Sequence, residues 1–112
     1  PYLYKQSLSL VMPTYLGPTN IPPLEAFFYK TPVCYSDKPS FREQVRDAAF
    51  YIDLKDPHSL VETIIKIKNN KELVNYKIHK GMEILSSWSE EDFYKCLITM
   101  FEEYQYIREG WE

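Results

Sequence analysis

Residues 8–28, LSLVMPTYLGPTNIPPLEAFF, determine the fold that the sequence predicts. The apolar residues between Leu8 and Met12 end at Pro13, and several turn-forming residues follow. Pro22 and Pro23 then open an apolar segment, and proline is tolerated in the first turn of a helix because its missing N–H would have no partner there. The stretch therefore predicts a buried strand, a tight loop and the start of a helix.

The loop and the helix start together form a candidate anion site. The first N–H groups of a helix have no partner within it, and the helix dipole adds partial positive charge there. We expect Asn20 to be the N-cap, with Glu25 one turn into the helix. The free backbone N–H groups that we expect are those of Gly17, Thr19, Asn20, Ile21, Leu24 and Glu25. A carboxylate beside such donors suits a ligand with phosphates and vicinal hydroxyls, such as a nucleoside diphosphate.

Two other interpretations of this stretch stay open. A strand, a loop and a proline-initiated helix also occur in α/β proteins without a ligand, where Glu25 only favours the helix N-terminus through the dipole. The chain is then a structural α/β domain in which residues 17–21 form a turn. The other alternative is a stand-alone nucleotide- or phosphate-binding module without transferase chemistry.

Length, composition and charge limit the classes of protein to which the chain can belong. The 112 residues suffice for one domain, and 45% hydrophobic and 16% aromatic residues provide a core. The net charge of −3 gives no basic footprint, so we expect no nucleic-acid partner. Lysines concentrate between Lys66 and Lys80, where they alternate with apolar residues. This pattern is typical of a solvated helix face, with a membrane-surface role as the alternative.

The cysteines do not indicate a metal site. Cys34 and Cys96 have no metal-ligand spacing with His58 or His79. We interpret both as core thiols of a reduced, cytoplasmic protein, and we predict no metal and no other cofactor. The N-terminal PYLYKQS is typical of the end of a helix. We therefore interpret the chain as a piece of a longer protein.

Expected strands and helices alternate along the chain. After a helix remnant, we expect strands over residues 8–12, 33–35 and 48–52 and helices over residues 22–29, 40–45, 57–68 and 71–87 and from 90 onward. This order predicts a three-layer α/β fold, a Rossmann-like parallel sheet of three strands with helices on both faces. Ligands of such sheets bind outside the carboxyl ends of the strands, where the loop over residues 14–21 lies.

Capping patterns and apolar stripes support these helices. We expect a capping box at Ser40 and Glu43, an N-cap at Asp56, and a second capping box at Ser89 and Asp92. The residues that we expect to face inward are Leu60, Val61, Ile64 and Ile65, then Val74, Ile78, Leu85 and Trp88, and finally Phe93, Leu97, Met100, Phe101 and Tyr104.

Four segments carry a family resemblance: PTYLGPTNIPPLEA (13–26), TPVCYS (31–36), FREQVRDAAFYIDLKDPHSLVETI (41–64) and SSWSEEDFYKCLITMF (86–101). In this order and spacing they resemble the C-terminal half of the donor-binding domain of retaining glycosyltransferases of family 4, which have the GT-B fold. The resemblance covers nearly the whole chain. It implies that residues 1–112 are a single partial domain, the C-terminal half of a nucleotide-sugar-binding Rossmann-like domain.

The resemblance assigns roles to individual residues. In that family two Glu residues flank the donor site, and the second hydrogen-bonds the ribose hydroxyls; Glu25 matches it. The first Glu falls on Gly17, a departure that leaves open which sugar is bound and how it is held. The family segment whose amides meet the diphosphate falls on Pro18, Thr19, Asn20 and Ile21. Glu43 matches a position near the rim of the site, but we favour its role in the cap.

The resemblance also implies a function. A retaining glycosyltransferase moves a sugar from a nucleoside diphosphate to an acceptor hydroxyl, and amides of this half-domain stabilise the leaving diphosphate. The acceptor site and much of the catalytic apparatus belong to an N-terminal domain of the family. We therefore assign no catalytic residue here and expect the isolated chain to be inactive. The base, the sugar and the acceptor stay open, and peripheral association of the full-length protein with the inner face of the membrane is an alternative to a purely cytoplasmic location.

The expected first strand, over residues 8–12, also predicts self-association of the chain. In the family the strand equivalent to residues 8–12 is central, and here the strands that would pair along its outer side are absent from the sequence. No charge protects this edge. We therefore expect the chain to self-associate through this edge or through the apolar surface beside it.

Overall fold

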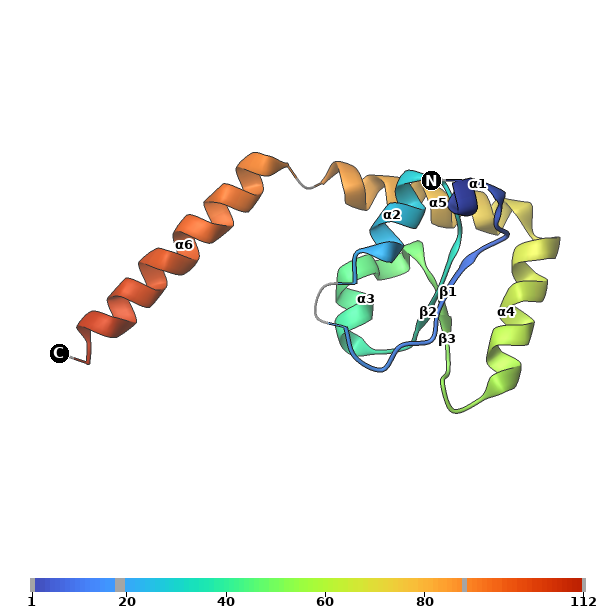
Figure 1. Cartoon of the computed structure of the whole chain (residues 1–112), viewed down its shortest axis with the longest axis horizontal. Helices are drawn as coiled ribbons and strands as arrows, with labels where there is room; N and C mark the ends of the chain where they lie inside the picture. The colour runs from blue at the N-terminus through green and yellow to red at the C-terminus, as the bar shows by residue number, and fades with distance from the viewer. Residues whose placement is uncertain (1, 18–19, 88, 112) are drawn as a thin grey trace.

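The computed structural model describes residues 2–17, 20–87 and 89–111. Its elements follow the order α1 (Tyr2–Gln6), β1 (Leu10–Met12), α2 (Pro22–Phe28), β2 (Val33–Ser36), α3 (Pro39–Val45), the 3-10 turn η1 (Arg46–Ala48), β3 (Phe50–Ile52), α4 (Pro57–Asn69), α5 (Lys71–Ser86) and α6 (Glu90–Glu109). In the described part of the chain the strands form one parallel sheet of three, in the order β1-β2-β3 (Figure 1). The predicted α/β class is confirmed.

The central strand β2 is buried on both sides of the sheet. Val33 and Tyr35 belong to one hydrophobic cluster, and Cys34 belongs to another on the opposite face. All residues of β2 are buried, as expected for a strand with helices on both faces. The first cluster is completed by Ala26, Phe27, Phe41, Val45, Ala48 and Ala49, and the second by Phe50, Ile52 and Ile67.

Helix α5 closes the amino end of the sheet. It runs from α4 past α2 across the top of the view in Figure 1. Gly81 lies at the crossing with α2, where an added Cβ would come within 2.5 Å of the Phe27 ring. The close approach of the two helices therefore requires glycine at this position of α5, although glycine weakens helix interiors.

An ion pair fastens α5 to the turn before β3. The Asp47 carboxylate in η1 accepts a 2.6 Å hydrogen bond from Lys77 Nζ and a 2.8 Å bond from the Tyr76 hydroxyl. The bond from Lys77, followed by that from Tyr76, holds the pKa of Asp47 below its ordinary value. Charge pairing here joins segments about 30 residues apart in the sequence.

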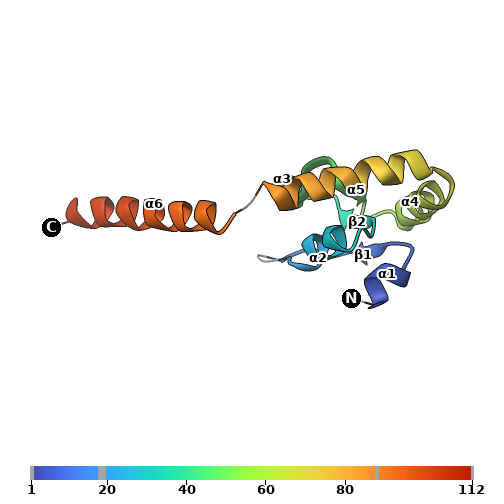
Figure 2. The same ribbon diagram turned by 90° about the horizontal axis from the view of Figure 1, so that it is seen from above.

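Helix α6 differs from prediction in two respects. It extends away from the sheet and its covering helices in both views (Figure 1) (Figure 2), and none of its residues is buried. Its expected inward stripe is wrong, because no other described element covers it; Phe101 and Tyr104 are both 61% exposed. Cys96 is exposed as well, so our interpretation of it as a core thiol is also wrong, whereas Cys34 is buried as expected. Trp88 lies outside the described residues.

Two further expectations are corrected near α3 and α4. Helix α3 begins at Pro39 after Lys38, without a side-chain cap, so the capping box at Ser40 and Glu43 is wrong. Proline at the first helical position moves the start one residue upstream. In α4 the side chains of Val61 and Ile65 are exposed, because the sheet covers the face that carries Leu60, Thr63, Ile64 and Ile67.

Other boundaries agree closely with prediction. Asp56 caps α4 by accepting from the N–H of His58, and Ser89 with Asp92 forms the predicted capping box of α6. The first and third strands are shorter than expected, and β2 extends one residue further, to Ser36. Strand β1 begins at Leu10, and β3 begins at Phe50 because η1 occupies the preceding residues.

Candidate functional site

The predicted donor loop lies where the sequence places it, after the carboxyl end of β1. Residues 13–21 connect β1 to α2, and α3 leaves the carboxyl end of the neighbouring strand β2 (Figure 1). Gly17 and Asn20 are in close contact. Pro18 and Thr19, which the sequence also assigns to the site, lie outside the described residues. The described part of the loop therefore borders both α2 and α3.

The start of α2 differs from prediction. Ile21, not Asn20, is the N-cap residue, and its φ of −71° and ψ of −37° are helical. The Ile21 carbonyl accepts from the N–H groups of Leu24 at 2.8 Å and Glu25 at 3.1 Å. These two amides belong to the first turn and are not free donors as expected. Among the residues that the structure describes, the N–H groups of Gly17, Asn20 and Ile21 have no acceptor.

Glu25 lies one turn along α2, and its carboxylate contacts α1. The Tyr4 hydroxyl donates a 2.8 Å hydrogen bond to Glu25 Oε2. The Tyr4 ring stacks on Tyr29 with ring centroids 5.6 Å apart, which holds α1 against the end of α2. Burial, followed by the bond to Glu25, raises the pKa of the Tyr4 hydroxyl, so it is a proton donor at neutral pH. One carboxylate oxygen of Glu25 is thus oriented and the other has no partner in the described part of the chain.

A cavity of about 520 Å³ adjoins the loop. It lies between the loop and α3, and its lining residues are Tyr15, Leu16, Gly17, Ser40, Phe41 and Gln44. None of these side chains is charged. Two aromatic rings, a hydroxyl and a carboxamide therefore face the cavity without a counter-ion for a phosphate.

Tyr35 and Gln44, which the sequence did not predict as site residues, hold the loop through a chain of hydrogen bonds with Asn20. The Asn20 carboxamide donates to the Tyr35 hydroxyl, which donates to Gln44 Oε1 at 3.1 Å. Gln44 Nε2 in turn donates to the Asn20 carbonyl at 2.8 Å. A tyrosine in the middle of a buried strand was the available signal, because a buried phenolic hydroxyl needs hydrogen-bond partners.

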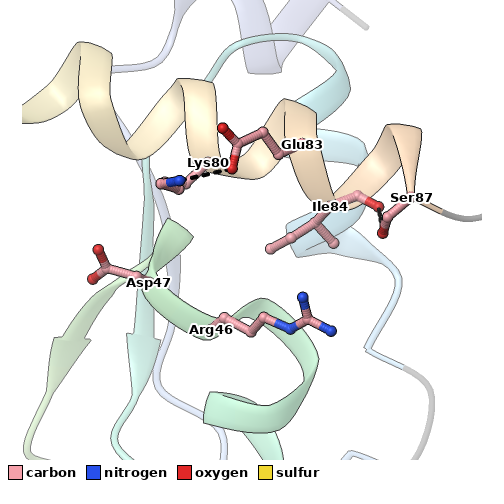
Figure 3. A pocket seen from close by; sticks show the side chains of 6 residues that line it. All are labelled: Arg46, Asp47, Lys80, Glu83, Ile84 and Ser87. Atoms are coloured by element: carbon pink, nitrogen blue, oxygen red, sulfur yellow. Dashed lines mark hydrogen bonds and ion pairs between the residues drawn. The ribbon is translucent and has the colours of Figure 1, made fainter.

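Two further cavities adjoin η1, which precedes the amino end of β3. One of about 380 Å³ is lined by Arg46, Asp47, Lys80, Glu83, Ile84 and Ser87 (Figure 3). Its charges are largely paired, since Lys80 binds Glu83 at 2.8 Å and Asp47 binds Lys77. An adjoining cavity of about 670 Å³ extends to Leu24, Leu85 and Phe93. The larger cavity also reaches Gln44, which lines the cavity beside the loop as well. The smaller cavity does not reach the carboxyl ends of the strands, where α/β proteins bind ligands.

Neither a metal-binding cluster nor a membrane-spanning helix is found in the described part of the chain. Within residues 2–17, 20–87 and 89–111, no group of three His, Cys, Asp or Glu side chains is placed to hold a metal ion. No helix in these same ranges combines the length and the apolar character needed to cross a bilayer.

Known proteins resemble this chain in sequence. A family model described as "Glycosyl transferases group 1" matches residues 1–83. The chain is 29% identical over 97 residues to the O-antigen chain mannosyltransferase RfbU of Salmonella typhimurium, a match that covers 80% of this chain and 28% of that protein. The chain thus spans less than a third of the length of this relative. No solved structure matches it.

Proposed function

The chain belongs to the Glycosyl transferases group 1 family, and on this premise we propose that it binds the nucleotide-sugar donor of a retaining glycosyltransferase. One observation carries the proposal. The loop after β1 presents N–H groups of Gly17, Asn20 and Ile21 that have no acceptor among the described residues, next to a helix whose fourth residue is Glu25. Amide donors beside a carboxylate match a diphosphate attached to a ribose.

Each residue of the site has a role in this proposal. The donor-binding residues are Gly17, Pro18, Thr19, Asn20, Ile21 and Glu25. The loop amides bind the diphosphate, and the Thr19 hydroxyl is a further donor. The Glu25 carboxylate accepts hydrogen bonds from the ribose hydroxyls. When the bond between sugar and diphosphate breaks, negative charge grows on the leaving phosphate, and preoriented N–H dipoles stabilise it without reorganisation.

The reaction needs residues beyond this chain. We assign no catalytic residue to it, because the acceptor site and the groups that contact the reacting carbon are expected in an N-terminal domain that the whole protein contributes. The isolated chain is therefore inactive in this proposal, and its partners are the nucleotide sugar and that domain. The chain needs no metal, and the reaction takes place in the cytoplasm or at the inner face of the membrane. The similarity to a protein named as a mannosyltransferase makes mannose the first sugar to test.

A transfer assay with the full-length protein tests the proposal. Wild type is incubated with nucleotide sugars that differ in base and in sugar, GDP-mannose included, and the products are analysed by NMR. We expect transfer or hydrolysis from one donor or a few, with the anomeric configuration of the donor retained. Binding of nucleoside diphosphates without transfer or hydrolysis would identify a binding module instead. An inverted product would contradict the retaining mechanism.

A further inference from the structure

Three side chains from separate segments close a ring of hydrogen bonds beneath the donor loop. Asn20 Nδ2 donates to the Tyr35 hydroxyl, and that hydroxyl donates to Gln44 Oε1 at 3.1 Å. The ring closes where Gln44 Nε2 donates to the Asn20 carbonyl at 2.8 Å. Each member therefore makes two of the contacts. Loss of the Tyr35 hydroxyl removes a partner from the side chains of both Asn20 and Gln44, whereas loss of the Asn20 side chain removes a partner from Tyr35 alone, because Gln44 binds the backbone carbonyl of Asn20.

The ring is anchored in the buried core of the sheet. Tyr35 belongs to the central strand β2 and is 0% exposed. Its ring stacks on Phe41 of α3, with centroids 4.4 Å apart and planes within 12° of each other. Burial raises the pKa of the Tyr35 hydroxyl, which keeps it neutral and able both to donate and to accept at neutral pH. The ring thus ties a surface loop to the core of the sheet.

The same Asn20 side chain is packed against Gly17. A Cβ added at Gly17 would lie 2.0 Å from Asn20 Oδ1 and 2.4 Å from its Cγ. Any side chain at Gly17 must therefore displace the carboxamide and break its bond to Tyr35. Gly17 and Asn20 are coupled, although no hydrogen bond joins them. The N–H groups of both residues, which have no acceptor among the described residues, are assigned to the diphosphate by the proposed function.

We propose that Asn20, Tyr35 and Gln44 form a positioning ring that holds the donor loop in its binding conformation. This inference rests on the proposed function of the loop. Tyr35 is buried and does not line the cavity beside the loop, so it acts through Asn20. Gln44 lines that cavity and also binds the Asn20 carbonyl. A loop that is already ordered loses less conformational entropy when the donor binds, so the ring raises donor affinity more than it affects the chemical step.

Removal of single ring contacts in the full-length protein tests the proposal. Tyr35→Phe removes only the hydroxyl, and Gln44→Met keeps the size of the side chain without its hydrogen bonds. We expect each variant to raise the Kd of GDP or UDP and the KM for the donor about tenfold, with a smaller change in kcat. Because the ring acts as a unit, the Kd of the double variant should be no higher than that of the single variant with the higher Kd.

Tyr51→Phe is the matched control. Tyr51 pairs with Tyr35 across β3 and β2, but its hydroxyl donates to the Arg46 carbonyl rather than to the loop. We expect wild-type Kd and KM for this variant. Wild-type values for Tyr35→Phe and Gln44→Met, or an equal loss in Tyr51→Phe, would overturn the proposal. Thermal unfolding of each variant identifies losses caused by instability, and Gln44, which is only half-buried, provides the test if Tyr35→Phe does not fold.

Gly17→Ala offers an independent test, because it breaks the ring without altering any member. We expect it to weaken nucleoside diphosphate binding as much as Asn20→Ala does, and the double variant to be no weaker than either. Additive losses of binding free energy would contradict the coupling.

The failure of the ring inference can be told from the failure of the proposed function. If wild type binds diphosphates but transfers no sugar, the proposed function fails while these binding measurements still decide the ring. If transfer occurs and the ring variants match wild type, the ring inference alone fails. If wild type neither binds diphosphates nor transfers sugar, both fail.

Discussion

The Tyr4 hydroxyl in α1 donates a 2.8 Å hydrogen bond to the carboxylate of Glu25 in α2. The two residues are 21 positions apart, and the bond crosses from the helix before β1 to the helix after it. Glu25 is exposed, so without this contact its side chain would sample several rotamers. Tyr4 therefore orients one carboxylate oxygen and leaves the other for the vicinal hydroxyls of a ribose.

Glu25→Gln in the full-length protein should weaken donor binding. Loss of a charge-assisted hydrogen bond costs about 1.5–3 kcal/mol, which is one to two decades in the Kd of the nucleotide sugar. Because Glu25 is exposed, the melting temperature should stay near that of wild type. Calorimetric titration and thermal unfolding check both points. Tyr4→Phe is the control: it should cost less than Glu25→Gln, because it disturbs only the orientation of the carboxylate. Normal donor binding by Glu25→Gln would refute the ribose assignment.

Gly81→Ala should destabilise the fold. The added Cβ would lie 2.5 Å from the ring of Phe27, which is only 1% exposed and enclosed by the core. Overpacking of this kind costs about 1–3 kcal/mol, against a gain of about 1 kcal/mol in helix propensity. We therefore expect a net loss of stability in urea unfolding. Gly110→Ala at the end of α6 is the matched control, since its Cβ would approach no atom closer than 3.4 Å. Equal stability of the two variants would show that α2 and α5 do not pack as described.

Asp47→Asn should remove part of the stability at neutral pH but not in acid. The folded-state pKa of Asp47 is lowered, first by Lys77 and then by Tyr76. A lowered pKa contributes stability above the unfolded-state value of about 3.9, and this stability is lost as the pH falls through the folded-state pKa. The side chain of Asp47 is 59% exposed, so solvent screening keeps the contribution below about 1 kcal/mol. Urea unfolding of both proteins from pH 7 to pH 2 should show the difference shrinking below about pH 4. A difference that grows in acid would contradict the ion pair.

The chain should self-associate in solution. Strand β1 is an edge strand whose outer side is unpaired within the described residues, and α6 adds a row of exposed apolar side chains. Sedimentation at micromolar concentration should show dimers or larger species. Val11→Lys places a charge on the edge of β1, and Phe101→Lys places one on α6. If Val11→Lys reduces self-association, the contact lies at the edge of β1. If Phe101→Lys reduces it, the contact lies on α6. A stable monomer with protected amides from Leu10 to Met12 would contradict the prediction.

The fold was predictable because its signals are local. Short apolar runs bounded by proline, glycine or aspartate predicted each strand, and capping residues such as Asp56 and Ser89 predicted helix starts. Each signal lies within a few residues of the element that it predicts. Their alternation leaves few arrangements other than a parallel sheet with covering helices.

The parts that the sequence did not predict depend on contacts between distant segments. Asn20 has a side chain suited to an N-cap, but its carboxamide binds Tyr35, which is 15 residues away. This tertiary hydrogen bond outweighs the local preference. The apolar stripe of α6 is a second example. Helical periodicity shows that one face favours burial, yet it does not identify what covers that face. The stripe is present in the sequence, but no described element of the chain covers it.

The central claim is that the loop after β1 binds the diphosphate of a nucleotide sugar, and amide NMR of the ¹⁵N-labelled chain during titration with GDP and UDP tests it most directly. The account predicts weak binding, because the N-terminal domain of the proposed transferase is not part of the titrated chain, with shift changes confined to Gly17, Thr19, Asn20, Ile21 and their neighbours. Amides of α4 and α6 should stay unchanged. If the loop amides stay unchanged while those around Arg46 and Lys80 move, the diphosphate binds beside η1 and the account is wrong.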